Sequence, residues 1–213
     1  MNSRTQRELV DGPVGPVECT LDRPESAPRG LALVCHPHPQ FGGTLDNKVV
    51  QTIARAFLQI GWASVRFNFR GIGRSAGAWG EGEGEVADAQ AMLAAWRARA
   101  EYATLPFALA GFSFGGYVAA EVAHRLSEDA ATPRRIVLVG PSTEKQTVAA
   151  VPADTVVVHG EIDDVVPLAA TLAWARPQSL PVIVFPGVGH FFHGQIASLK
   201  NVIVRELHDL DAV

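Results

Sequence analysis

Short runs of hydrophobic residues alternate along the chain with longer segments whose hydrophobic residues recur every three or four positions. The short runs are typical of strands buried on both faces of a sheet, and the longer segments of amphipathic helices. Two alternating segments, 8–10 and 16–21, predict an antiparallel hairpin whose prolines favour an edge of the sheet. Six further strands are predicted at 31–35, 62–67, 106–110, 135–139, 155–159 and 181–185.

Helical stripes fill the intervals between these strands. They are predicted over 47–58, after Gly84, after Ser113, after Pro167 (which suits the first turn of a helix) and over about 194–210. Strands that alternate with helices favour an α/β fold, a mostly parallel sheet with helices on both faces. Because no linker or internal repeat divides the chain, we predict a single domain over residues 1–213. In such a sheet, functional residues gather at the carboxyl ends of the strands.

Composition and charge narrow the classes of protein to consider. Of the 213 residues, 47% are hydrophobic and 19% are charged, with a net charge of −4, which is a globular composition. No lysine and arginine cluster exists to neutralise phosphates, so we expect no nucleic-acid partner. No apolar run has the length of a membrane span or of a signal peptide. Two cysteines do not make a disulfide framework, so we expect a cytoplasmic protein with free thiols.

The chemistry of the chain centres on Gly111-Phe112-Ser113-Phe114-Gly115, which lies between a predicted strand and a predicted helix. A strand that turns directly into a helix around a serine strains that serine and exposes its hydroxyl at the edge of the sheet. The two glycines leave room for the tight crossing. This context predicts that Ser113 is a nucleophile, with the N–H of Phe114 beside it at the helix N-terminus.

A serine nucleophile needs a base, and the base needs a carboxylate that fixes its tautomer. Glu161, Asp163 and Asp164 follow the predicted strand 155–159, whereas Asp154 precedes it and so lies at the wrong edge. We favour Asp163 as the acid. Asp164, which would also suit a helix-capping turn, is the alternative.

The base should come after the last predicted strand. His190 follows that strand on a glycine-containing loop that can fold over the edge of the sheet, and His193 comes three residues later, where a helix is expected. We favour His190 over His193. The resulting order Ser113, Asp163, His190 is the chain order of a nucleophile-elbow hydrolase.

The oxyanion of a tetrahedral intermediate needs two hydrogen-bond donors. The N–H of Phe114 is one, and the other should come from the loop 36–43, in which the prolines have no N–H to donate. We favour the N–H of His38 and keep Gln40 and Phe41 as alternatives. The two histidines of this loop are separated by one proline, and no third ligand of clear spacing accompanies them, so we expect neither a metal nor another cofactor.

These motifs together resemble the α/β-hydrolases, and the resemblance extends over nearly the whole chain. The matching stretches are His36-Pro37-His38-Pro39, Phe69-Arg70-Gly71-Ile72-Gly73-Arg74-Ser75, Gly111-Phe112-Ser113-Phe114-Gly115-Gly116, His159-Gly160-Glu161-Ile162-Asp163 and Gly189-His190-Phe191-Phe192. In particular, the chain resembles small bacterial hydrolases with a His-Pro-His-Pro loop and a Gly-His-Phe-Phe ending. The resemblance implies an eight-stranded sheet with the second strand antiparallel, and it supports Ser113, Asp163 and His190 as nucleophile, acid and base.

The chain departs from the superfamily pattern at two places. Many members have an aspartate where this chain has Asn68, so an ion pair at that position is in doubt. The segment between the sixth and seventh strands, where a lid is commonly inserted, is only about residues 140–154. We therefore expect an open site without a cap domain.

These inferences predict a serine hydrolase that cleaves carboxylic esters of small or short-chain acids through an acyl-enzyme on Ser113. Thioester or amide hydrolysis by the same residues is the alternative, followed by a non-catalytic binding protein on this fold. The cleft candidates are Phe41, Trp79 and Phe191, whereas Phe192 is expected in the core. The acidic loop 80–85 and the arginines at 70 and 74 point to opposite charge preferences, so the preference for substrate charge stays open.

Overall fold

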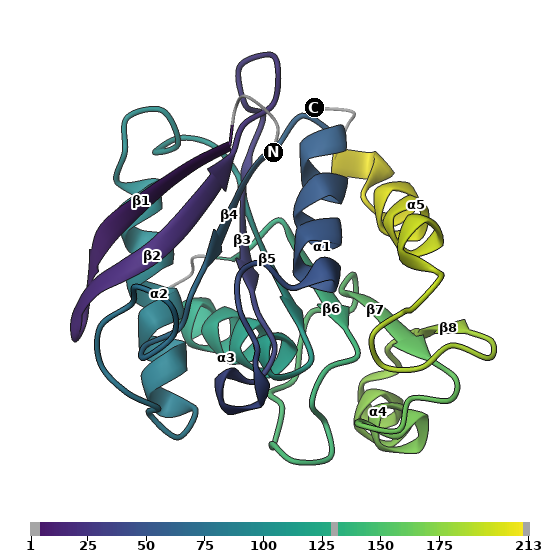
Figure 1. The fold of residues 1–213 in the computed structure, drawn as a ribbon. Coiled ribbons are helices and arrows are strands. Elements are labelled where there is room, and N and C mark those ends of the chain that lie inside the picture. The colour runs from purple at the N-terminus through teal and green to yellow at the C-terminus, as the bar shows by residue number, and fades with distance from the viewer. Residues whose placement is uncertain (1–4, 129–131, 211–213) are drawn as a thin grey trace.

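The computed structural model describes residues 5–128 and 132–210, which form one eight-stranded sheet between two layers of helices (Figure 1). The strands are β1 (Thr5–Gly12), β2 (Gly15–Asp22), β3 (Leu31–Cys35), β4 (Ala63–Phe67), β5 (Phe107–Phe112), β6 (Arg135–Val139), β7 (Val156–Gly160) and β8 (Ile183–Phe185). The α-helices are α1 (Lys48–Gln59), α2 (Glu83–Arg97), α3 (Phe114–Glu128), α4 (Leu168–Ala175) and α5 (Ile196–Glu206). Short 3-10 helices are η1 (Pro39–Phe41), η2 (Arg176–Gln178) and η3 (His208–Leu210).

The strands lie in the order β1-β2-β4-β3-β5-β6-β7-β8. β2 is antiparallel to both of its neighbours, and every other adjacent pair is parallel. The predicted sheet, mostly parallel with its second strand antiparallel, is therefore confirmed. Because the parallel strands end at the same edge, the loops after β3, β5, β7 and β8 converge there.

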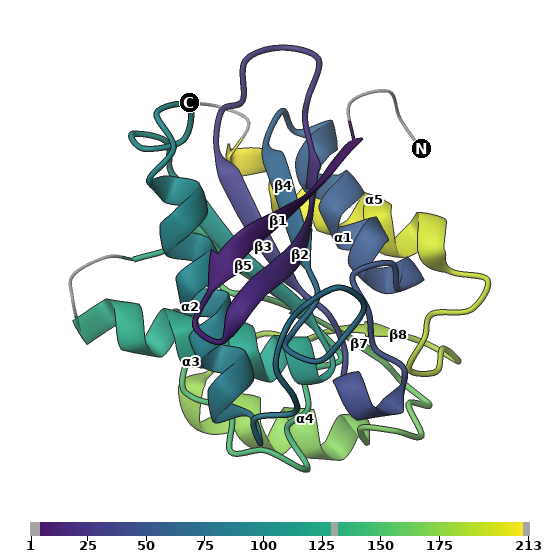
Figure 2. The ribbon, with the colours of Figure 1, turned by 60° about the vertical axis from the view of Figure 1, so that its left-hand side comes forward.

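The sheet is apolar on both faces, which explains the unbroken hydrophobic runs. In β3, Leu31, Leu33 and Cys35 pack into the core beneath α2 and α3, whereas Ala32 and Val34 pack into the core beneath α1 and α5. Figure 2 shows these two helix pairs on opposite sides of the sheet. Both faces are thus buried, and the polar groups of the site are confined to the edge.

Three local predictions were wrong. Pro167 has a ψ of 133°, so it is the extended N-cap residue of α4 rather than part of its first turn. His193 lies in a turn before α5, because Gly194 takes a φ of 75° that breaks the helical path. The last strand is three residues instead of the predicted 181–185, since it is the edge strand and pairs only with β7.

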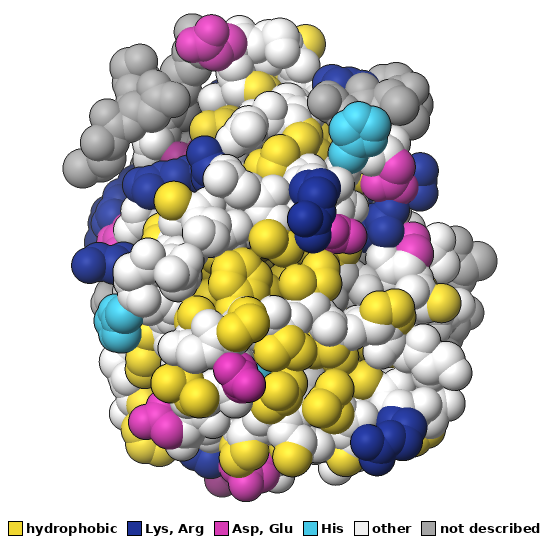
Figure 3. Space-filling view, turned by 90° about the vertical axis from the view of Figure 1, so that its right-hand side faces the viewer, with side chains coloured by type: hydrophobic (Ala, Val, Ile, Leu, Met, Phe, Trp, Pro, Cys, Tyr) yellow, Lys and Arg dark blue, Asp and Glu magenta, His cyan; other side chains and the backbone are white. Residues whose placement is uncertain are grey.

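The outer face beside this edge strand is partly apolar. Figure 3 shows hydrophobic side chains gathered over its lower half, at the level where β8 and α4 lie in Figure 1. Exposed large hydrophobic residues of this part of the chain include Ile162, Leu172 and Val184. The shortness of β8 limits the open strand edge to three residues.

The sequence predicted free cysteines and no membrane span, and the structure bears on both. Cys19 and Cys35 are both buried and free, and burial raises the pKa of the Cys35 thiol, which keeps it protonated and unreactive. Within residues 5–128 and 132–210, the helices are too short or too polar to cross a bilayer.

Candidate active site

Ser113 occupies the sharp turn between β5 and α3. Its φ of 56° lies in the left-handed region, which is unfavourable for a residue with a side chain. A Cβ atom on Gly111 would overlap the carbonyl oxygen of Gly115, and one on Gly115 would overlap the carbonyl oxygen of Cys35. The turn therefore requires both glycines of the motif.

Hydrogen bonds on both sides hold this strained turn in place. The N–H of Ser113 donates to the carbonyl of Val139 at 2.9 Å, and its carbonyl accepts from the N–H of Gly116 at 2.9 Å and of Ser142 at 3.2 Å. The partner strand β6 and the loop after it thus fix the direction of the Ser113 hydroxyl. The neighbouring backbone over-determines the conformation, as expected for strain kept at a functional site.

His190 and Asp163 meet at the same edge of the sheet. The Nδ1 atom of His190 lies 2.6 Å from Oδ2 of Asp163, and both residues are buried. Oδ1 of Asp163 accepts from the N–H of Val165 at 2.9 Å and of Val166 at 2.8 Å. Burial acts to raise the pKa of Asp163, but the His190 hydrogen bond and these N–H donors outweigh it and lower the pKa below its usual value. An ionised Asp163 keeps the proton of His190 on Nδ1, which leaves Nε2 as an acceptor.

The alternatives considered for these two positions lie elsewhere. Asp164 is exposed, and Glu161 accepts a hydrogen bond from the N–H of Gly187 at 2.8 Å. His193 is exposed, whereas the ring of His190 packs against Phe112, with centroids 4.8 Å apart. The structure thus brings Asp163, not Asp164, to His190.

A third histidine, His159, backs the carboxylate of Asp163. Its Nε2 donates to the carbonyl of Val166 at 2.8 Å and lies 3.5 Å from Oδ2 of Asp163, and burial lowers its pKa. The second ring nitrogen is buried without a partner among the described residues. His159 is therefore a neutral support for the Asp163 turn, and the sequence motif gave no indication of this role.

Ser113 and His190 open into one cavity of about 450 Å³. Its lining is Pro37, His38, Phe41, Gly42, Gly43, Asn47, Ser113, Phe114, Ser142, Lys145, Gln146, Val165, Val166, His190 and Phe191. Phe41 is 78% exposed at the rim, and Phe191 lies against the ring of His190 at 5.1 Å. Residues 140–155, between β6 and β7, contain no helix that could cover the cavity.

Trp79 does not line this cavity, contrary to the prediction. Its ring lies 4.6 Å from that of His38 and 5.4 Å from that of Phe114, so it supports two residues that do line it. The spacing of aromatic residues along the sequence does not distinguish a residue that lines the cavity from one that packs behind the lining. Phe192, expected in the core, is fully buried there.

The loop after β3 presents backbone donors to the cavity. The N–H of Gln40 donates to Nδ1 of His38 at 3.3 Å, and the N–H of Phe41 donates to the carbonyl of His38 at 3.1 Å. In contrast, the N–H groups of His38 and Phe114 have no acceptor among the described residues. Of the three residues considered for the second donor, His38 is thus the one whose N–H is free.

His36 holds this loop from below. Its Nδ1 lies 2.6 Å from the carbonyl of Pro37, and its Nε2 accepts from the N–H of Phe69 at 3.0 Å, so both ring nitrogens are used within the chain. Complete burial lowers the pKa of His36 to about 4, which keeps the ring neutral. The residue positions the His38 loop rather than binding a ligand.

Asn68, a departure from the superfamily pattern, bridges two segments near this loop. Its Nδ2 donates to Oε2 of Glu18 at 2.8 Å, and its Oδ1 accepts from the N–H of Leu45 at 2.8 Å. An aspartate would place a second carboxylate against Glu18 and could not donate to it. The amide therefore suits a site where the charge comes from Glu18.

Two charged residues that the sequence singled out, Arg70 and Glu85 of the acidic loop, are bonded within the chain. Arg70 pairs with the buried Asp88 at 2.7 Å, and both carboxylate oxygens of Glu85 accept N–H groups of the turn that begins α2. Lys145, in the loop after β6, is the one lysine, arginine or acidic residue in the cavity lining. The sequence analysis missed Lys145, because nothing in its local pattern distinguishes it from a surface lysine.

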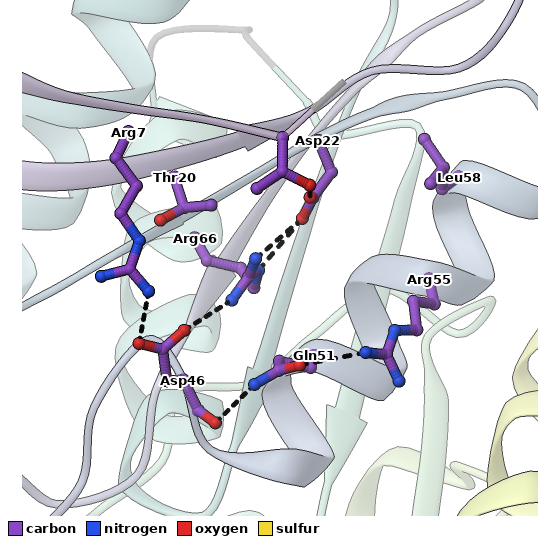
Figure 4. A pocket seen from close by; sticks show the side chains of 9 residues that line it. Arg7, Thr20, Asp22, Asp46, Gln51, Arg55, Leu58 and Arg66 are labelled. Atoms are coloured by element: carbon purple, nitrogen blue, oxygen red, sulfur yellow. Dashed lines mark hydrogen bonds and ion pairs between the residues drawn. The ribbon is translucent and has the colours of Figure 1, made fainter. Parts of the chain in front are cut away.

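A second cavity, of about 500 Å³, lies between α1 and the strands β1, β2 and β4 (Figure 4). Arg66 donates to Oδ2 of Asp22 at 2.9 Å and to the carbonyl of Leu45 at 2.8 Å. Arg7 donates to Oδ2 of Asp46 at 2.6 Å. We call this site the edge cavity. Two of its three arginines are paired with its two aspartates, and the third, Arg55, donates to Oε1 of Gln51 at 3.1 Å.

The fold and the elbow serine define the class of this protein, an α/β serine hydrolase without a lid. Residues 27–157 match the family model Hydrolase_4, described as serine aminopeptidase, S33, and the chain belongs to this family. The match covers more than half of the chain, including Ser113 but not His190.

Two solved structures agree with this assignment, and one curated protein is similar to part of the chain. An α/β serine hydrolase homologue from Coxiella burnetii is 37% identical, with a TM-score of 0.86, over 95% of this chain and 97% of that one. An α/β serine hydrolase without a lid from Xanthomonas campestris is 33% identical, with a TM-score of 0.88, over 98% and 96%. An uncharacterized protein of Rickettsia prowazekii is 36% identical over 118 residues, 55% of this chain and 49% of that protein. The match thus spans about half the length of that curated relative. A hydrolytic function is supported.

Proposed function

We propose that this protein hydrolyses carboxylic esters of small acids through an acyl-enzyme on Ser113. The observation that carries the proposal is one cavity that holds a strained serine, a histidine bonded to a buried carboxylate, and two backbone N–H groups without acceptors. This is the set of groups that acyl transfer requires. A binding protein would gain nothing from the strain at Ser113.

Each group has a defined part in the reaction. Nε2 of His190 takes the proton of Ser113 Oγ as this oxygen attacks the carbonyl carbon, and then passes that proton to the departing alcohol. Asp163 stabilises the imidazolium. The N–H groups of Phe114 and His38 bind the oxyanion, at about 3 kcal/mol of transition-state stabilisation for each donor. Water, activated by His190 in turn, releases the acid and restores Ser113.

The cavity favours an ester over the peptide substrate that the family description suggests. An aminopeptidase must bind the ammonium group of a peptide N-terminus, for which a carboxylate near the scissile bond is the natural partner. The lining contains no aspartate or glutamate, and its lysine would repel an ammonium group. With no helix over it, a cavity of about 450 Å³ suits a small acyl or alcohol group.

A fluorophosphonate probe tests the nucleophile. We expect the wild-type protein to be labelled and Ser113→Ala to remain unlabelled. A panel of esters, thioesters and amides with graded acyl length then tests the substrate class, with kcat/KM highest for short esters. Higher kcat/KM for thioesters or for amides would replace the ester assignment.

The acid is tested by two matched variants. Asp163→Asn should lower kcat/KM by about 10⁴-fold, because the amide no longer fixes the His190 tautomer, whereas Asp164→Asn should stay near wild type. Equal rates for Asp163→Asn and the wild type would remove Asp163 from the mechanism. Circular dichroism of both variants checks that the fold is retained.

A further inference from the structure

Lys145 stands alone as a charged group at the rim of the catalytic cavity. It makes no ion pair within the described part of the chain, and its Nζ lies 5.8 Å from the centroid of the Phe41 ring. The cation–π contact with Phe41 holds the ammonium over an aromatic wall instead of beside a carboxylate. An unpaired cation in the lining that also contains Ser113 can attract an anion to this cavity.

Two amide side chains beside Lys145 are also available. The Oε1 atom of Gln146 is buried and has no partner among the described residues, and rotation of the amide exchanges this oxygen for an N–H donor. The Oδ1 atom of Asn47 caps α1 by accepting from Val49 and Val50, which leaves its NH₂ group as a donor toward the cavity lining. The positive end of α1, a helix of 12 residues, starts at the same place.

The acidic groups nearest to this charge lie outside the lining. Glu144, next to Lys145 in the chain, and Asp164 are exposed and form no ion pair with Lys145 within the described part of the chain. Asp163 is bonded to His190, and Asp46 is bonded to Arg7 in the edge cavity. Glu83, the first residue of α2, accepts from Arg125 at 2.7 Å. The sequence left the preference for substrate charge open. In the structure, the charged side chain of the cavity lining is that of Lys145, so the lining is cationic.

We propose that the preferred esters carry a carboxylate remote from the scissile carbonyl and that Lys145, assisted by the amides of Gln146 and Asn47, binds this carboxylate. The proposal rests on the proposed ester hydrolysis and adds its substrate class. Lys145 is a specificity-determining residue in this scheme. It does not touch the reacting atoms, and its contribution is to the binding of the distal group.

Two pairs of esters that differ in one charge test the proposal. The first pair is 4-acetoxybenzoate and its methyl ester, with the carboxylate on the alcohol side. The second is mono-4-nitrophenyl adipate and its methyl ester, with the carboxylate on the acyl side. We expect the wild type to show a higher kcat/KM for the anionic member of at least one pair, with Ser113→Ala supplying the background rate.

The variants should then change the ratio of anionic to neutral kcat/KM. Lys145→Gln should lower this ratio by about two- to fivefold, the range of one exposed ion pair, and Lys145→Glu by about four- to 25-fold. Lys145→Arg should retain the preference. Lys200→Gln, on α5 and outside the cavity, removes the same charge and should leave the ratio unchanged. Added salt should reduce the wild-type preference.

The outcomes separate this proposal from the one on which it rests. If neutral and anionic esters are hydrolysed at rates that Lys145→Glu does not alter in ratio, the carboxylate site is wrong and ester hydrolysis stands. If all four esters are turned over no faster than with Ser113→Ala, the proposed ester hydrolysis fails and the carboxylate site fails with it.

Discussion

The cavity at Ser113, called here the catalytic cavity, and the edge cavity have similar volumes, about 450 and 500 Å³, and differ in whether their charged side chains are paired with one another. In the edge cavity, Arg66 is bonded to Asp22, and Arg7 is bonded to Asp46. In the catalytic cavity, the N–H groups of His38 and Phe114 have no acceptor, and the ammonium of Lys145 has no acidic partner, among the described residues.

This difference shows that volume alone does not identify a functional site. Buried polar groups without partners cost stability, so a protein retains them where a ligand or a transition state will use them. Mutually paired charges need no ligand. The contrast predicts that changes in the catalytic cavity affect rate and that changes in the edge cavity affect stability.

The largest effect is expected at Ser113. Ser113→Gly and Ser113→Ala should both lower kcat/KM by at least about 10⁴-fold, because the proposed nucleophile is lost. Only the glycine relieves the positive φ, so Ser113→Gly should be more stable than Ser113→Ala by about 1 kcal/mol in urea unfolding. Equal free energies of unfolding for the two variants would show that the turn is not strained.

The next largest effect is a pH dependence of the free energy of unfolding. It is expected from His36, which is buried beneath the His38 loop. Burial holds its folded-state pKa at about 4, below the ordinary 6.5, so the unfolded chain takes up a proton first as the pH falls. The contribution of His36 to stability is thus complete above pH 6.5 and is lost between pH 6.5 and 4, by about 3 kcal/mol in total. Protonation of Nε2 would break its bond from the N–H of Phe69.

His36→Gln removes this titration and gives the measurement. The decrease in the free energy of unfolding from pH 7 to pH 4 should be about 3 kcal/mol smaller for the variant than for the wild type, whatever the variant's stability at pH 7. Parallel pH profiles for the two proteins would show that His36 does not titrate in this range.

The two cavities also differ in how many of their residues can be predicted from the sequence. The elbow, His190 and Asp163 could be proposed from the sequence because each follows a strand of a parallel sheet, where chain order and position are linked. The edge cavity joins residues far apart in sequence, such as Arg7 and Asp46, that have no shared motif. The register between strands, which brings Thr20 opposite both Arg7 and Arg66, is a property of the folded sheet.

Within the catalytic cavity, the residues that were predicted belong to sequence motifs, and those that were missed do not. Ser113 and His38 belong to motifs, whereas Lys145 depends on the path of a loop without regular structure. Trp79 was misplaced because hydrophobic pattern does not distinguish a residue that lines a cavity from one that supports the lining. Such distinctions depend on packing, which a single sequence does not encode locally.

The smallest of the expected effects is a loss of stability in variants of the edge cavity, and it tests the contrast between the two cavities. Arg66→Met should lower the free energy of unfolding by about 2 kcal/mol, because it leaves the carboxylate of Asp22 unpaired. That figure is below the cost for a fully buried pair, since the side chain of Asp22 is 15% exposed. Arg55→Met, at the rim, removes only a hydrogen bond to Gln51 and should change stability by less than about 0.5 kcal/mol.

The double variant Arg66→Met/Asp22→Leu completes this test, because it replaces both charges with apolar groups and should recover much of the lost stability. Urea unfolding and kcat/KM of the folded protein are measured for each variant. If the edge cavity is structural, the rates stay within a few-fold of wild type, although Arg66 also holds the carbonyl of Leu45 in the loop that leads to Asn47. A variant of normal stability that has lost ester hydrolysis would overturn the contrast, because it would make the paired charges part of the reaction.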